Sequence, residues 1–165
     1  MRALNQAGIS GAGLKWPNDV LHQHRKLAGI LIELQGDMLG PSAAVIGIGI
    51  NLKLSSKVLN RIDQAVVDIH SIGGKVLERN LLLANILLHL ADVLNDFDAG
   101  GFSILREEWL KYHAYQEKRV LLMLPDGNQH EGYLLDVADD GALLVRTAIG
   151  KQRFTSGEIS LRTVA

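Results

Sequence analysis

The first part of the chain alternates between short apolar runs and polar turns, which is typical of antiparallel strands. Met1–Ala7 indicates the end of a helix that stops at Gly8. Leu14–Trp16 predicts a short strand that runs into a Pro-Asn-Asp turn. His22–Arg25 is polar and indicates a hairpin turn. We therefore expect a sheet to begin close to the N-terminus.

Two longer apolar runs continue this pattern. Lys26–Leu34 is almost continuously apolar and predicts a buried strand. Ala43–Ile50 is rich in Val and Ile and predicts a third strand. Leu52–Gly74 has mixed polarity, and we expect it to be irregular.

The pattern then changes to a helical period. Asn80 is a suitable N-cap for a helix that runs to about Asp98, and Gly100–Gly101 would end it. A second helix is expected over 102–112, and we expect it to turn three side chains inward. The apolar face expected on the first helix consists of Leu83, Leu87, Leu90, Leu94 and Phe97. The inward side chains expected on the second helix are Leu105, Trp109 and Tyr112.

After His113 the period changes to that of short strands. Asp126-Gly127 and Asp140-Gly141 mark tight turns between them. Five strands in so short a segment suggest a small SH3-like β-barrel. We expect an α+β chain with a domain boundary near 114–118, giving domains 1–115 and 116–165. The predicted strands are Val120–Leu124, Gly132–Val137, Ala142–Thr147, Gln152–Thr155 and Glu158–Arg162.

Composition excludes several classes of function. The 165 residues are 47% hydrophobic and 21% charged, with a net charge of −1, so there is no general attraction to nucleic acid or anionic membranes. There is no cysteine, which rules out disulfides and thiolate chemistry. Residues 1–13 do not form a signal peptide, and Leu81–Leu90 is shorter than a membrane span of about 20 residues. We expect a cytoplasmic protein without nucleic-acid or membrane partners.

Lys15 is the first candidate for chemistry. It precedes a Trp-Pro pair, and Pro17 restricts Trp16 to an extended backbone. A stiff support of this kind suits a catalytic cation. A lone lysine is more often an ordinary solvated side chain. The unusual KWPND pentapeptide at 15–19 favours the catalytic interpretation.

The glycines of the third strand are the second candidate. Gly47 and Gly49 alternate on one face, with isoleucines on the other. Such glycines often mark a close approach to the backbone, here either by a flat ligand or by a neighbouring aromatic side chain or helix. These two interpretations have equal weight from the strand alone. Gly29 suggests the same more weakly, and Asn51 is either a donor to phosphate or ribose or a turn former.

Other polar residues carry little signal. His22 and His24 are separated by one residue, but no further ligands lie near them, so we expect no metal site. Glu107 and Glu108 are expected on a solvated helix face. The chain contains no P-loop and no dinucleotide-binding fingerprint.

Three motifs, in this order, resemble the second half of a biotin protein ligase catalytic domain. They are KWPND at 15–19, KLAGIL at 26–31 and GIGIN at 47–51. GEISLR at 157–162 is similar to the end of that family's small C-terminal domain. The resemblance implies part of a class II synthetase-like mixed sheet with helices, followed by the SH3-like domain.

The resemblance also implies an activity. Members of this family join the biotin carboxylate to the α-phosphate of ATP, with release of pyrophosphate. A lysine of a biotin carboxyl carrier protein then takes the biotin from biotinyl-AMP. The implied ligands are biotin and ATP with Mg²⁺, and the implied partner is the carrier domain of a carboxylase. A homodimer is left open.

Carried over from the family, Lys15 would contact the biotin carboxylate and the phosphate. Gly47 and Gly49 would form the floor of the biotin pocket, with Gly29 on the strand beside it. The segment 52–62 matches a loop that orders over the adenine, and its irregular sequence suits a segment that folds on ligand binding. The residues implied on the adenylate side are Asn18, Lys26, Asn51, Leu52 and Arg162.

The chain also departs from the family pattern. It begins fourteen residues before Lys15, so the family's glycine- and arginine-rich loop, its biotin-holding Ser-Thr and Gln residues and any helix-turn-helix are missing. We expect a truncated chain that is inactive alone. The alternatives are a non-catalytic biotin-binding or dimerisation module and a biotin-dependent transcriptional co-repressor fragment. The co-repressor is the weakest, because no basic patch is present. KWPND argues against a lipoate ligase.

Overall fold

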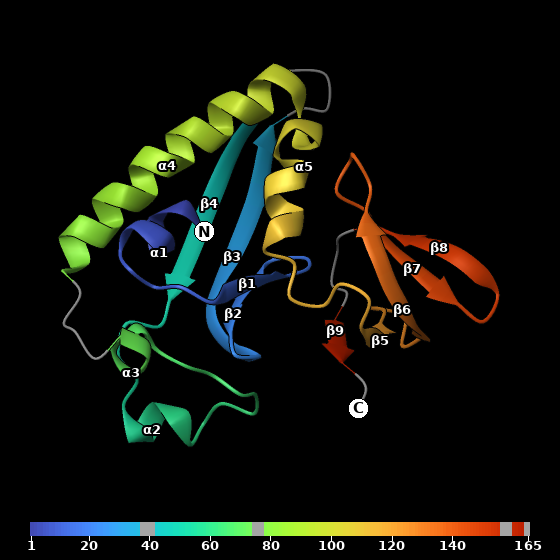
Figure 1. Ribbon diagram of the computed structural model, residues 1–165, viewed down its shortest axis with the longest axis horizontal. Coiled ribbons are helices and arrows are strands. Elements are labelled where there is room, and N and C mark those ends of the chain that lie inside the picture. Colours follow the sequence, from blue (N-terminus) through green and yellow to red (C-terminus); the bar gives the residue numbers. More distant parts are fainter. Residues whose placement is uncertain (37–41, 74–77, 156–159, 164–165) are drawn as a thin grey trace.

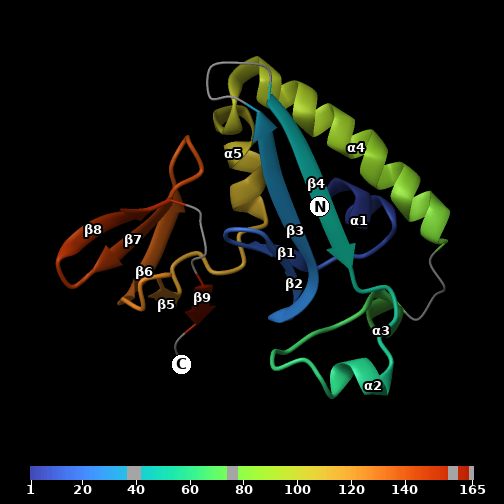
Figure 2. The ribbon, with the colours of Figure 1, turned by 180° about the vertical axis from the view of Figure 1, so that it is seen from behind.

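The computed structural model describes residues 1–36, 42–73, 78–155 and 160–163. These residues form two antiparallel sheets and a set of helices (Figures 1 and 2). The expected α+β class is confirmed. The division into domains 1–115 and 116–165 remains a prediction, and the chain passes from the last helix into the second sheet through residues 112–118.

The first sheet has the simple order β1-β2-β3-β4, with each strand antiparallel to the next. The three predicted strands are present, and β2 lies between the first two. The sequence pattern missed β2 because it has only four residues and polar side chains at both ends. The strands are β1 (Ala12–Lys15), β2 (Asp19–His22), β3 (Arg25–Gly36) and β4 (Ser42–Ile50).

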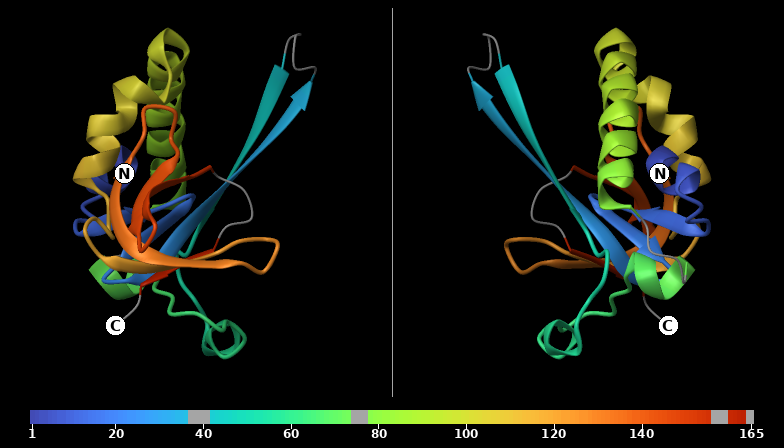
Figure 3. Two further views of the ribbon diagram at one scale, coloured as in Figure 1. Left: turned by 90° about the vertical axis from the view of Figure 1, so that its right-hand side faces the viewer. Right: turned by 90° about the vertical axis from the view of Figure 1, so that its left-hand side faces the viewer.

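The expectation that Lys26–Leu34 is a buried strand is wrong for most of its length. Leu27 and Ala28 are buried, but Leu31 is 61% exposed and Leu34 is 76% exposed. The reason is geometric, because β2 pairs with β3 only as far as Gly29. Beyond that residue β3 pairs with β4 alone, and the two strands project as a ribbon away from the helices (Figure 3).

Helices α1, α4 and α5 lie on one side of the first sheet (Figure 3). Leu4 of α1 and Leu82 of α4 pack with Val20 and Leu27 of the sheet in one hydrophobic core. No helix in the described parts of the chain is long and apolar enough to cross a membrane. The helices are α1 (Arg2–Gln6), α2 (Ser56–Leu59), α3 (Ile69–Gly73), α4 (Arg79–Gly100) and α5 (Phe102–Lys111).

The long helix α4 presents a different face from the one predicted. Leu82 is 3% exposed and packs into the core, whereas Leu83, Leu87 and Phe97 of the expected face are more than half exposed. The helix is apolar on nearly every side, so its pattern did not select one face. Its N-cap is Glu78 and not Asn80.

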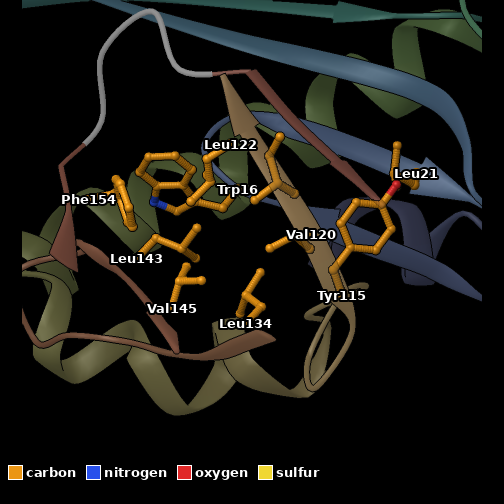
Figure 4. Close-up of a cluster of buried hydrophobic side chains, with 10 residues drawn as sticks. Trp16, Leu21, Tyr115, Val120, Leu122, Leu134, Leu143, Val145 and Phe154 are labelled. Atoms are coloured by element: carbon orange, nitrogen blue, oxygen red, sulfur yellow. The ribbon is translucent and has the colours of Figure 1, made fainter. Parts of the chain in front are cut away.

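The second sheet contains the five predicted strands in the order β8-β7-β6-β5-β9. Its ends, β8 and β9, do not pair with each other in the described residues, so the sheet predicted as a small SH3-like β-barrel is not closed there. Residues from every strand of this sheet build a second core (Figure 4). The strands are β5 (Arg119–Met123), β6 (Gln129–Val137), β7 (Leu143–Thr147), β8 (Gly150–Phe154) and β9 (Ser160–Thr163).

Candidate functional site

The register of the first sheet places residues of all three motifs in one row. Lys15 of β1 is opposite Asp19 of β2, Asp19 is opposite Gly29 of β3, and Gly29 is opposite Gly49 of β4. Directly paired residues in antiparallel strands point to the same face of a sheet. The row therefore crosses four strands on a single face.

A carboxylate in this row joins two lysines. Asp19 Oδ2 lies 3.2 Å from Lys15 Nζ, and its Oδ1 lies 2.6 Å from Lys26 Nζ. The Asp19 side chain is only 12% exposed, so water screens these pairs less than at an open surface. Sequence reasoning did not select Asp19 as a site residue, although its place in KWPND was the available signal.

A β-bulge brings Lys26 to this face. Val20 pairs with Ala28 and Leu21 pairs with Lys26, so Leu27 is an extra residue between them. Strict alternation would put Lys26 and Gly29 on opposite faces, and the bulge reverses this. A Cβ added to Gly29 would lie 3.3 Å from both Cε and Nζ of Lys26. In this structure the space at Gly29 is taken by the lysine.

Gly47 and Gly49 are open in a different way. A Cβ at Gly49 would meet only the carbonyl oxygen of Gly29, at 4.0 Å. A Cβ at Gly47 would meet only the Leu31 backbone at 3.6 Å and its Cβ at 4.0 Å. The alternative interpretation required an aromatic side chain or a helix to pack on these glycines. Within the described residues, neither does. This part of the sheet presents bare backbone.

A cavity of about 340 Å³ lies on the other side of the sheet. Ile30, Ile48 and Ile50 line its floor, and Leu90 and Trp109 belong to its helical walls. Because side chains alternate along a strand, these isoleucines face away from Gly29, Gly47 and Gly49. The cavity belongs to the apolar space between sheet and helices, and it reaches the row at Lys15 and Asp19.

Asn51 has a structural role at the end of β4. Its Nδ2 donates to the carbonyl oxygens of Lys26 and Val67, both at 3.1 Å. One amide hydrogen therefore joins the end of β4 to β3, and the other joins it to the segment before α3. A contact of Asn51 with the nucleotide remains a prediction.

The expectation that 52–74 is irregular is wrong for residues 56–59, which form α2, and for residues 69–73, which form α3. The segment 52–62 therefore contains a short helix. The buried Asp68 side chain holds its start by accepting from the Leu54 N–H at 2.7 Å. Asp68 also accepts from the N–H of Ser71 at 2.7 Å and from its hydroxyl at 2.6 Å. Burial alone would raise the pKa of Asp68, but these hydrogen bonds outweigh it and the pKa is lowered.

The remaining predicted residues are dispersed. Arg162 is exposed on β9 opposite Leu121, and within the described residues it forms no ion pair with the Lys15 row. Asn18 is exposed, and its carbonyl oxygen accepts from the Ile30 N–H at 2.8 Å. The backbone of Leu52 accepts from the N–H of His70 at 3.1 Å. In the described ranges, no cluster of three His, Cys, Asp or Glu side chains suits a metal ion.

Comparisons with known proteins match both parts of the chain. Residues 1–51 match the model of the Biotin/lipoate A/B protein ligase family, and residues 117–162 match that of the Biotin protein ligase C terminal domain. The Bifunctional ligase/repressor BirA of Salmonella typhimurium is 32% identical over 160 residues, which is 97% of this chain. The chain belongs to the biotin protein ligase family.

Other members of the biotin protein ligase family give the same picture. The Biotin–[acetyl-CoA-carboxylase] ligase of Paracoccus denitrificans is 28% identical over 88% of this chain. The chain spans about half of the Salmonella protein (49%) and 61% of the Paracoccus protein.

Solved structures of biotin protein ligases share the fold. The apo biotin protein ligase of Aquifex aeolicus superposes with a TM-score of 0.86 at 28% identity, covering 98% of this chain and 70% of that one. The Aquifex enzyme in complex with biotin and ATP gives a TM-score of 0.83 at 27% identity, covering 98% and 66%.

Proposed function

We propose that this chain contains the surface of a biotin protein ligase that binds biotin and ATP. The reaction joins biotin and ATP into biotinyl-AMP and then transfers biotin to a lysine of a biotin carboxyl carrier protein. The observation that carries the proposal is the row Lys15, Asp19, Gly29 and Gly49. Its carboxylate, Asp19, holds the Lys15 and Lys26 ammonium groups on the face where the backbone at Gly49 is bare.

The first step requires two anions to meet. A biotin carboxylate oxygen attacks the α-phosphorus of ATP, a new P–O bond forms and pyrophosphate leaves. A fixed ammonium lowers the repulsion where negative charge accumulates, and we assign this role to Lys15. Lys26 adds a second cation on the adenylate side, and Asp19 keeps both lysines in place.

The glycines shape the other half of the site. Gly47 and Gly49 let a flat ring system approach the strand backbone, which any larger side chain would block. In the second step the acceptor lysine amine attacks the biotinyl carbonyl carbon, the amide forms and AMP leaves. Asn18, Asn51, Leu52 and Arg162 remain proposed on the nucleotide side.

The proposal includes ligands and partners that follow from the family. Mg²⁺ would enter as the counter-ion of ATP, because Mg²⁺ is usually held by substrate phosphates and few protein groups. We propose the cytoplasm as the location, since ATP and the carboxylase acceptor are available there. The Aquifex complex with biotin and ATP supports the choice of ligands. The homodimer remains a prediction that light scattering would test.

The test is a calorimetric titration of the chain with biotin, alone and with MgATP. We expect weak but saturable binding that Lys15→Ala lowers about ten-fold or more, because one fixed charged contact is lost. Lys118→Ala removes an exposed lysine outside the row and is the matched control, expected to bind like the wild type.

Equal binding by wild type and Lys15→Ala would remove Lys15 from the site, and the absence of any binding would contradict the proposal. Pyrophosphate release separates a ligase from a non-catalytic biotin-binding module. The co-repressor function is not proposed, because only the names of relatives suggest it.

A further inference from the structure

Trp16 follows Lys15 directly in the chain and is buried where the two sheets meet (Figure 4). Its side chain is 4% exposed. Apart from Trp16 and Leu21, the buried residues of this hydrophobic cluster come from Tyr115 and the second sheet. The residue next to the proposed catalytic lysine therefore belongs to the core of the other sheet.

A hydrogen bond fixes the Trp16 ring in this position. The indole Nε1–H donates to the carbonyl oxygen of Gly141 at 3.0 Å. Gly141 lies in the β6–β7 turn with φ +84°, a conformation that favours glycine, and its own N–H donates to Ala138 O at 2.8 Å. The acceptor of the indole is thus set by the turn of the second sheet.

Strand β1 depends on the same part of the chain along its outer edge. It is an edge strand that pairs with β2 on one side. On its other side the Leu14 N–H donates to Tyr112 O at 2.6 Å, and the Ala114 N–H donates to Leu14 O at 2.9 Å. Both contacts come from the segment that leads into the second sheet. The two chain neighbours of Lys15 are therefore both held from this side: Leu14 by this segment and Trp16 by the second sheet.

We infer that the second sheet positions Lys15 through Trp16, so that Trp16 is a positioning residue of the proposed ligase site. The inference rests on the proposed function only for what Lys15 does chemically. Without the indole hydrogen bond, the end of β1 gains freedom. The Lys15 ammonium then leaves Asp19, now 3.2 Å away, more often.

The experiment measures the acylation rate of individual lysines in the full chain, by peptide mass spectrometry after brief exposure to an amine-reactive reagent well below the melting temperature. Trp16→Phe keeps an aromatic ring but removes the donor. We expect Lys15 to react about five-fold faster, the change in population that corresponds to one ordinary hydrogen bond. Lys118 should react at an unchanged rate.

Phe154→Leu is the matched control, because Phe154 packs in the same cluster without contributing the indole hydrogen bond. We expect this variant to lower the melting temperature while leaving the Lys15 rate unchanged. Gly141→Ala, which disturbs the acceptor turn, should reproduce the faster Lys15 reaction and keeps the test valid if Trp16→Phe does not fold.

Equal Lys15 rates in wild type and the folded Trp16→Phe or Gly141→Ala variant would overturn the inference. An equal acceleration in Phe154→Leu would also overturn it, because general loosening of the cluster would then suffice. A lack of biotin binding would remove the proposed function but leave the labelling result intact, so the two failures are distinguishable.

Discussion

Single residues of the row differ in what a new side chain would meet. Gly49 has open space above it, whereas Gly29 already shares its space with the Lys26 side chain. A substitution at Gly49 therefore tests ligand binding with little disturbance of the chain itself. A substitution at Gly29 would displace a charged group as well.

We expect Gly49→Val to abolish biotin binding while leaving the melting temperature nearly unchanged. Valine is a good strand residue, and its Cβ meets only the Gly29 carbonyl at 4.0 Å. Calorimetry with biotin and a thermal scan measure the two effects. Ile48→Val, on the opposite face, is the control. Unchanged biotin affinity in Gly49→Val would show that the ligand does not use this face.

Sequence motifs located Lys15, Gly29, Gly47 and Gly49, and pairing in the sheet brings Lys15, Gly29 and Gly49 into one row. What the motifs did not show is the cross-strand relation of Lys26 to Asp19. That relation depends on the bulge at Leu27, and a bulge has no reliable signature in a single sequence.

At the level of elements, the strands were easier to predict than the faces they bury. A pattern of apolar positions locates a strand, but burial depends on which other elements reach it. The outer half of β3 is exposed because β2 stops short of it. Helix α4 shows the same problem, since its many leucines allow more than one inward face.

For α4 we expect Leu82→Ala to lower the free energy of unfolding by about 2–5 kcal/mol, because it empties a fully packed core position. Leu87→Ala, on the same helix but 57% exposed, should cost little. Urea unfolding followed by circular dichroism measures both. A larger loss for Leu87→Ala than for Leu82→Ala would mean that the face first predicted from the sequence is the buried one.

For the whole molecule, the segment between α5 and β5 joins the two sheets and contains an unusual histidine. Burial lowers the pKa of His113 from 6.5 to about 4, although the Asp136 carboxylate acts in the opposite direction. Neither ring nitrogen has a hydrogen-bond partner in the described residues, and the ring packs on Trp109 at 4.5 Å between centroids. The folded chain therefore resists protonation at this position.

We expect stability to fall as the pH drops from about 6.5 to about 4. In that window the unfolded chain binds a proton at His113 that the folded chain does not, so acid favours unfolding. Above pH 6.5 this contribution is constant. Melting temperatures at about pH 7, 6 and 5 give the dependence of stability on pH, and His113→Gln should flatten this dependence. An identical slope in both proteins would exclude His113 as its source.

We also expect the chain alone not to biotinylate a carrier domain. Its glycine face is open, and a site open to water weakens the effect of Lys15 and Lys26 on the phosphates. Incubation with biotin, MgATP and a carboxyl carrier domain, followed by mass spectrometry of the acceptor, is the test. Transfer at a rate comparable to an intact ligase would show that an enclosed site is unnecessary.

The burial of Trp16 in the second sheet also gives the molecule an optical reporter. The chain has two tryptophans, and the other one, Trp109, lies on α5. In a Trp109→Phe variant all indole fluorescence would come from the junction beside Lys15. If the sheets part, water reaches that indole and its emission moves to longer wavelength, so separation of the two halves can be followed in real time without any attached dye.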